Sequence, residues 1–317
     1  MDNGVVYISI TTTRLSKWRS KMQITPVGQT RPGFTHHRVA INAAEIHYVS
    51  AGTRGSPILL VHGFPETWWT FHKVMPLLAE RHRVFALDLR GFGDSSAGDD
   101  MQDGNTAAAD LHDLIAHLDV GPVHLAGQDI AGASLFQLAA KHPADITSFT
   151  AIEMGLAGFG LEALADITHG GAWHIGVLAA PGIAQMLLTG HEDAFLQFMF
   201  ASMSADPAAI SPTDIAEFAR TYARPDGWQG AAALYRSMLR DGAAIKAIAQ
   251  AEPLSMPVLA IGAGGGEFTA ATMAQVSLHK IRTVLLDGVG HYAAMEAPDR
   301  MASAMLDFLA DVDGDKL

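Results

Sequence analysis

The sequence predicts an α/β protein with a mostly parallel central sheet. Short apolar runs with the length of buried strands alternate with apolar residues at helical spacing. The four runs that carry this prediction are residues 58–61, 84–87, 123–126 and 149–152. Strands that alternate with helices favour parallel pairing, and ligands in such sheets bind at the carboxyl ends of the strands. Polar residues follow these runs at His62, Asp88, Asp129 and Glu153.

The rest of the chain fits around these strands. Residues 39–48 alternate in polarity and predict a hairpin or a pair of edge strands. The strand rhythm stops at about residue 155 and returns at 258–261 and 283–286, and Pro298 opens a last helix. We therefore expect an α/β core at 34–154 and 252–317, a helical cap at 155–251, and a loosely held arm at 1–33.

Composition excludes several classes of function. The 317 residues carry a net charge of −12 and show no basic patch, so we expect no nucleic-acid partner. No uncharged apolar run reaches the roughly 18 residues of a membrane span, so we expect no membrane insertion. There is no cysteine, hence no disulfide or thiolate metal site. The histidines lack the HExxH spacing and the glycines lack the P-loop form, so we expect no metal and no cofactor. The start of the chain lacks the charge order of a secretory signal, and we expect a cytoplasmic protein.

A nucleophile elbow is predicted at Gly127-Gln128-Asp129-Ile130-Ala131. Small residues two positions before and after Asp129 allow the sharp turn between a strand and a helix. Asp129 stands where esterases carry serine, and a carboxylate there predicts an alkyl-ester intermediate. The alternative is an aspartate that only caps the helix.

Two further features predict hydrolysis of such an ester. His291 lies in a loop after the last strand and is the candidate general base. The backbone N–H groups of Phe64 and Ile130 are candidates for an oxyanion hole. The alternative for His62-Gly63-Phe64-Pro65 is a purely structural turn, in which Pro65 is a candidate cis-proline.

These motifs, in this order, resemble the α/β-hydrolase fold and, within it, the epoxide hydrolases. The stretches that carry the resemblance are 62–68, 88–95, 127–129 and 290–292. The sequence is most similar to the bacterial branch typified by cystic fibrosis transmembrane conductance regulator inhibitory factor. That resemblance implies Glu153 as the triad acid and a His–Tyr pair in the cap, here His174 and Tyr235, as donors to the oxirane oxygen. Glu267, in the glycine-rich loop after 258–261, is the alternative acid.

Other positions leave alternatives open. Gln128 and Ala131 depart from the His and Gly usual in the family. Trp68, Trp173 and Phe198 are candidates to line an apolar pocket for a small hydrophobic epoxide, or are simply packed residues. A haloalkane or haloacetate dehalogenase would use the same Asp129, His291 and Glu153, although Ile130 and Ala133 stand where the haloacetate branch carries arginines. A non-catalytic small-molecule binder is the third hypothesis, and a homodimer is left open.

Overall fold

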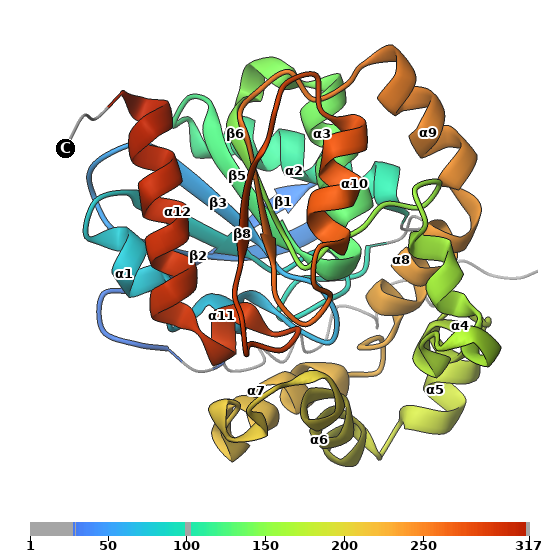
Figure 1. Ribbon diagram of the computed structural model, residues 1–317. Coiled ribbons are helices and arrows are strands. Elements are labelled where there is room, and N and C mark those ends of the chain that lie inside the picture. Colours follow the sequence, from blue (N-terminus) through green and yellow to red (C-terminus); the bar gives the residue numbers. More distant parts are fainter. Residues whose placement is uncertain (1–27, 29, 99–102, 315–317) are drawn as a thin grey trace, which may run out of the picture.

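The computed structural model of the chain describes residues 28, 30–98 and 103–314. Within these residues, eight strands form one sheet in the order β1-β2-β4-β3-β5-β6-β7-β8, as Figure 1 shows. The strands are β1 (Thr35–Ile41), β2 (Ala44–Ala51), β3 (Pro57–Val61), β4 (Arg83–Leu87), β5 (Val123–Gln128), β6 (Ile146–Ile152), β7 (Val258–Gly262) and β8 (Arg282–Leu285). Most of the arm expected at 1–33 lies outside the described residues.

The sheet is antiparallel only at one edge. Strands β1 and β2 form a hairpin that turns at Asn42 and Ala43, and β2 pairs antiparallel with β4. All the other neighbours are parallel. The pairs Val61↔Gly127 and Gln128↔Ile152 align the ends of β3, β5 and β6. The residues that follow these strands therefore meet at one edge of the sheet.

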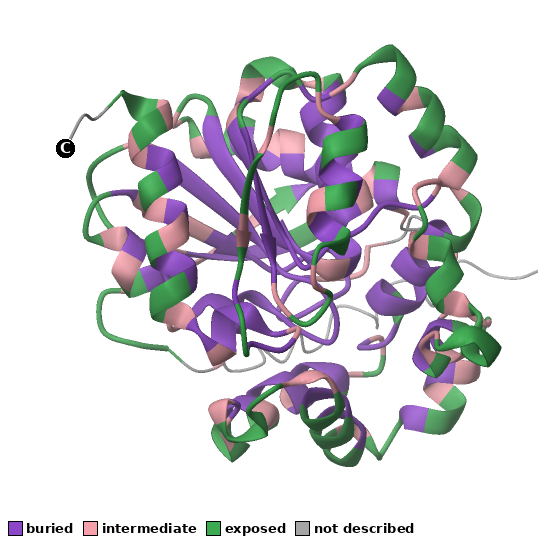
Figure 2. Cartoon of the chain, viewed as in Figure 1, coloured by how far each residue is buried: buried purple, intermediate pink, exposed green. Residues whose placement is uncertain are grey.

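Helices cover both faces of the sheet. Helices α1 and α12 pack together on one face, while α2, α3 and α10 lie across the sheet from them (Figure 1). The core helices are α1 (Met75–Ala79), α2 (Gly104–Leu118), α3 (Gly132–Lys141), α10 (Phe268–Val276), α11 (Ala293–Glu296) and α12 (Pro298–Asp313). The central strands are buried on both faces, in agreement with their continuous apolar sequences (Figure 2).

A helical segment joins β6 to β7. Its α-helices are α4 (Trp173–Ala179), α5 (Ile183–Leu188), α6 (Glu192–Met203), α7 (Pro212–Tyr222), α8 (Gln229–Arg240) and α9 (Gly242–Ala251). Helix α4 packs on α8, and α8 packs against the turn that follows β5. Residues from this segment therefore reach the edge where β3, β5 and β6 end. No helix among the described residues is long and apolar enough to span a bilayer.

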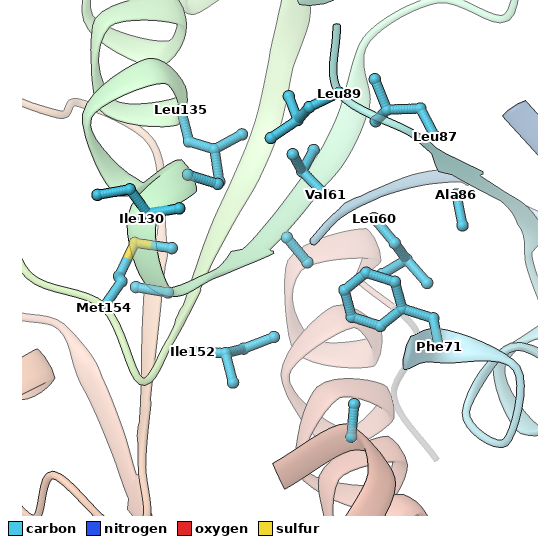
Figure 3. Packing of buried hydrophobic residues seen from close by; sticks show 14 of the residues in the cluster. Leu60, Val61, Phe71, Ala86, Leu87, Leu89, Ile130, Leu135, Ile152 and Met154 are labelled. Atoms are coloured by element: carbon cyan, nitrogen blue, oxygen red, sulfur yellow. The ribbon is translucent and has the colours of Figure 1, made fainter. Parts of the chain in front are cut away.

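The hydrophobic core packs around the ends of β3, β5 and β6. Ile130, Leu135 and Met154 lie around the turn after β5, and Val61 and Leu60 continue the packing along β3 (Figure 3). Each of these side chains is at most 6% exposed. Burial of a side chain of this size contributes about 1.5–3 kcal/mol. The turn is thus held by close packing on an apolar base.

Candidate active site

Asp129 lies in a strained turn between β5 and α3. It begins a short 3-10 helix, η2 (Asp129–Ala131), with φ of 54°. This left-handed conformation is costly for a residue with a side chain, and such residues cluster at functional sites. The Phe64 N–H donates a hydrogen bond of 2.9 Å to Asp129 Oδ2. A Cβ atom at Gly63 would lie only 2.5 Å from that of Asp129, so this approach requires glycine.

The loop after β3 presents the Phe64 N–H. His62 is fully buried, its Nδ1 donates to the Gly63 carbonyl at 2.7 Å, and its Nε2 accepts from the Leu89 N–H at 3.1 Å. Burial lowers the pKa of His62, in keeping with the neutral ring that this pairing needs. The Phe64–Pro65 peptide bond is cis. His62 therefore has a structural task, whereas Phe64 contacts the candidate nucleophile through its backbone.

His291 lies between two carboxylates. Its Nε2 is 3.7 Å from Asp129 Oδ1, and its Nδ1 is 3.2 Å from Glu153 Oε2. Burial by itself lowers the pKa of His291, but the hydrogen bond to Glu153 and the negative charges of Asp129 and Glu153 outweigh it and raise the pKa to about 9. The free protein therefore holds an imidazolium here at neutral pH.

The glycine-rich loop after β7 holds the Glu153 carboxylate. The Ala263 N–H donates to Oε1 at 2.5 Å, and the Gly265 N–H donates to Oε2 at 2.8 Å. Glu153 itself has φ of 45°, a second left-handed residue at this site. A Cβ atom at Gly264 would lie 2.9 Å from the backbone nitrogen of His291, so the loop passes close to the His291 backbone. The glycines thus allow backbone donors to reach a carboxylate.

Glu267 occupies a different place. It is exposed at the start of α10 and borders a separate pocket of about 320 Å³, formed with β7 and β8, whose lining does not include Glu153. It makes no described hydrogen bond with His291, whereas Glu153 does. Of the two acids suggested by the sequence, Glu153 is the one that the fold brings to the imidazole.

His174 and Tyr235 meet over Phe64. The centroids of the two rings are 5.8 Å apart. The His174 centroid lies 6.0 Å, and the Tyr235 centroid 5.4 Å, from that of the Phe64 ring. Burial lowers the pKa of His174, so the ring is neutral near pH 7. Burial, followed by the charge of Asp129, raises the pKa of Tyr235 well above its usual value, so the phenol keeps its proton. Two neutral hydrogen-bond donors therefore stand beside the residue that contacts Asp129.

Two buried residues to which the sequence assigned no role, Glu66 and Gln128, complete the surroundings. Glu66 accepts from Thr70 Oγ1 at 2.5 Å, from the Gly63 N–H at 3.2 Å and from Gln128 Nε2 at 3.3 Å. Gln128 Nε2 also lies 3.3 Å from the His291 carbonyl oxygen. Gln128, unexplained in the sequence, thus links the loop after β3 to the His291 loop. The only sequence signal was that it departs from the family's usual histidine.

A cavity of about 390 Å³ opens onto Asp129 and His291. The rest of the lining comes from the segment that follows β6, the glycine-rich loop after β7, the end of α6 and the start of α10. The lining residues are Glu153, Gly155, Leu161, Leu164, Ser202, Met203, Gly264, Gly265, Phe268 and Thr269. No arginine or lysine is among them, so the cavity suits an uncharged, largely apolar ligand.

The aromatic residues expected to line the pocket do not border this cavity. Trp68 is buried against Phe34, His36 and His47, near the β1–β2 hairpin. Trp173 and Phe198 pack on each other and are 43% and 54% exposed. Their places follow from packing partners that lie far apart in the sequence. The apolar lining is supplied instead by Leu161, Leu164, Met203 and Phe268.

Two groups of described side chains have the composition of metal ligands, and neither is at this site. His47, Asp88 and Asp94 are buried, but Asp88 is already bonded to His47 Nδ1 and to the Trp68 and Asp94 N–H groups. His112, in the middle of α2, stacks on the ring of His142 at 3.8 Å just past the end of α3, and its Nδ1 is already paired with Asp145 Oδ2 at 2.7 Å.

A family model and curated relatives match most of the chain. The family model described as the alpha/beta hydrolase fold matches residues 56–298. A soluble epoxide hydrolase of Corynebacterium sp. is 29% identical over 87% of this chain and 97% of its own length, and a fluoroacetate dehalogenase of Burkholderia sp. is 25% identical over 88% and 95%.

Solved structures agree with the fold. Cfl2 from Burkholderia cenocepacia superposes with a TM-score of 0.83 at 29% identity, over 90% of this chain and 99% of that one. The Cif epoxide hydrolase from Acinetobacter nosocomialis has a TM-score of 0.81 at 22% identity, over 89% and 91%. The expected fold and the resemblance on which it rested are confirmed: the chain belongs to the α/β-hydrolase fold family.

Proposed function

We propose that this protein is an epoxide hydrolase that opens an oxirane to a vicinal diol through an ester on Asp129. The observation that carries the proposal is the pair of buried, neutral donors His174 and Tyr235 beside Phe64, whose N–H binds Asp129. An alkoxide is a poor leaving group, and two donors aimed at the ring oxygen would remove that barrier. The similarity to named epoxide hydrolases supports the same reaction.

In the first step, an Asp129 carboxylate oxygen attacks one oxirane carbon. A new C–O ester bond forms, and the bond from that carbon to the ring oxygen breaks with its electron pair. The ring oxygen takes a proton from Tyr235, while the neutral His174 ring donates a hydrogen bond to it, and becomes the hydroxyl of a hydroxyalkyl ester. The turn after β5 holds the carboxylate in place for this in-line attack.

In the second step, water attacks the ester carbonyl of Asp129, and His291 takes its proton. The raised pKa of His291 rests in part on the Asp129 charge, which the ester removes. Esterification therefore lowers the pKa of His291 and frees Nε2 to act as base. The Phe64 and Ile130 N–H groups would receive the developing oxyanion. Its collapse expels the diol oxygen, which takes the second proton of the attacking water, and restores the Asp129 carboxylate. The proton that His291 loses on esterification replaces the one that Tyr235 gave to the ring oxygen, so the site returns to its starting state.

A dehalogenase would use the same nucleophile, base and acid. It would also need N–H donors around the halide, but Trp68 is buried at the hairpin and Trp173 is partly exposed on the helical segment between β6 and β7, and neither indole borders the cavity at Asp129. The cavity lining also holds no arginine for a haloacetate carboxylate. These placements favour the epoxide over the halide.

The test compares the two chemistries on one preparation. Purified protein is incubated with a panel of aliphatic and aryl epoxides and with haloalkanes and haloacetates, and diol and halide release are measured. We expect diol from at least one epoxide, no halide, and no turnover by Asp129→Asn. Halide release without diol would instead support a dehalogenase. If neither diol nor halide is formed, the result would favour a non-catalytic small-molecule binder.

A further inference from the structure

One partly exposed aromatic side chain lines the cavity where the core and the cap pack together. Phe268 is the first residue of α10 and belongs to the core, and it is 36% exposed. Leu161 and Leu164 belong to the first turn of the cap, in η4 (Leu161–Ala165), and Leu164 is 42% exposed. All three line the cavity that ends at Asp129. An exposed aromatic at the rim of a reactive cavity has a ready task in contacting what enters it.

Gly155 holds this junction together. A Cβ atom at Gly155 would lie 2.4 Å from the Phe268 ring and 3.2 Å from Leu161 Cδ1. The Phe268 ring and Leu161 therefore both pack on the backbone of Gly155, two residues after Glu153. This packing fixes the ring at the rim, so it is a wall of the passage and not a free surface side chain.

The other side of Asp129 is occupied differently. His174, Tyr235 and Phe64 pack on each other, each is at most 8% exposed, and none borders this cavity. An oxirane held by the His174 and Tyr235 donors would therefore have its polar ring at the closed, hydrogen-bonding end. An apolar substituent would extend the other way, past His291 towards Met203 and Phe268.

We propose that Phe268 is a specificity-determining residue, and that the passage it borders binds the alkyl substituent of a lipophilic epoxide. This inference rests on the proposed function and goes further by naming the part of the substrate that is recognised and the side chain that recognises it. The passage has apolar walls from both core and cap, and the charged groups among its lining residues are those of the site itself, Asp129, Glu153 and His291, so the affinity that the apolar walls add grows with buried apolar area.

The proposal is tested with a homologous series. kcat/KM is measured for 1,2-epoxybutane, 1,2-epoxyhexane and 1,2-epoxyoctane with the natural protein, with Phe268→Ala and Phe268→Leu, and with Leu278→Ala as control. Leu278 is also an exposed large apolar residue, 61% exposed, but it precedes β8 at the opposite end of the sheet. In parallel, binding of the diols 1,2-butanediol and 1,2-octanediol is measured by calorimetry, which needs no turnover.

For the natural protein we expect kcat/KM to rise about fourfold per methylene, the factor that corresponds to burial of one CH₂ group. In Phe268→Ala the rise should fall to about twofold per methylene, with 1,2-epoxybutane within about twofold of the natural value and Phe268→Leu in between. Leu278→Ala should match the natural protein.

Three outcomes separate the two proposals. Equal change for all three epoxides in Phe268→Ala, or the same profile as Leu278→Ala, would overturn the role of Phe268. If no epoxide is turned over but the octanediol preference depends on Phe268, the passage stands and the proposed reaction fails. If turnover occurs with no dependence on chain length in any variant, the reaction stands and the passage proposal fails.

Discussion

Replacing Glu153 with glutamine should block hydrolysis of the ester while leaving its formation largely intact. The Glu153 carboxylate accepts three hydrogen bonds, from the Ala263 N–H, the Gly265 N–H and His291 Nδ1. A glutamine amide keeps the shape but turns one oxygen into a donor. Wherever the NH₂ group is placed, it faces a group that also donates.

The distances decide which contact yields. The Ala263 nitrogen lies 2.5 Å from Oε1, the shortest of the three contacts, so we expect the NH₂ group to take the Oε2 place. There it displaces the Gly265 N–H, whose nitrogen is 2.8 Å away, and faces His291 Nδ1 at 3.2 Å. His291 must then release the Nδ1 proton and carry its proton on Nε2, the atom that should take a proton from water. The corresponding Asp→Asn change in a Ser-His-Asp triad costs about 10⁴-fold in kcat for this reason. We expect ester hydrolysis to slow by about 10³–10⁴-fold.

Rapid mixing with excess epoxide, followed by acid quench and intact-mass measurement, separates the two steps. Glu153→Gln should accumulate nearly complete ester at a rate within about tenfold of the natural protein, since the tautomer of His291 has no part in the attack by Asp129. Glu267→Gln is the matched control and should behave as the natural protein. Ester hydrolysis within tenfold of the natural rate, or an equal loss in Glu267→Gln, would refute the assignment of Glu153.

Three further predictions concern charge and proton donation. Because the pKa of His291 rises from 6.5 to about 9 on folding, protonation of His291 stabilises the folded state, and this stabilisation is fully present below pH 6.5 and is lost as pH rises through 9. Denaturant titrations should show that the free energy of unfolding falls by at most about 3 kcal/mol over this range, and this fall should be absent in His291→Gln. Burial raises the pKa of Glu66 from 4.5 to about 7, so the free energy of unfolding falls as pH rises through that window. Glu66→Gln should be more stable than the natural protein by at most about 3 kcal/mol at pH 8 and nearly as stable as it at pH 4.5. An equal change in stability at both pH values would contradict this. Tyr235→Phe and His174→Leu should each slow ester formation by about 10²–10³-fold without slowing ester hydrolysis, as measured by the same quench experiment.

Much of the fold was predictable because buried parallel strands have continuous apolar sequences. The runs at 58–61, 84–87, 123–126 and 149–152 all fall within strands, and the loss of strand rhythm after 155 coincides with helices α4 to α9. The expected hairpin at 39–48 corresponds to β1 and β2. Short helices such as α1 and α11 were not anticipated, since four or five residues are too few to show a helical period.

The site was predictable where a residue's place depends on a strand end. Asp129, Glu153 and the Phe64 loop each follow a strand directly, so the parallel sheet brings them to one edge. The choice between Glu153 and Glu267 required the path of the glycine-rich loop, which local sequence does not define. Trp68, Trp173 and Phe198 do not border the cavity at Asp129, because side chains on helices pack according to distant partners. Glu66 and Phe268 were missed for the same reason.

The central claim is that Asp129 forms an ester with an epoxide and that His291 is needed only to hydrolyse it. His291→Gln removes the base and retains a polar side chain of moderate size. After incubation with a substrate epoxide, its intact mass should increase by the mass of one epoxide molecule, and peptide mapping should place the adduct on Asp129. An unmodified protein, or an adduct that also forms in His291→Gln combined with Asp129→Asn, would contradict the account.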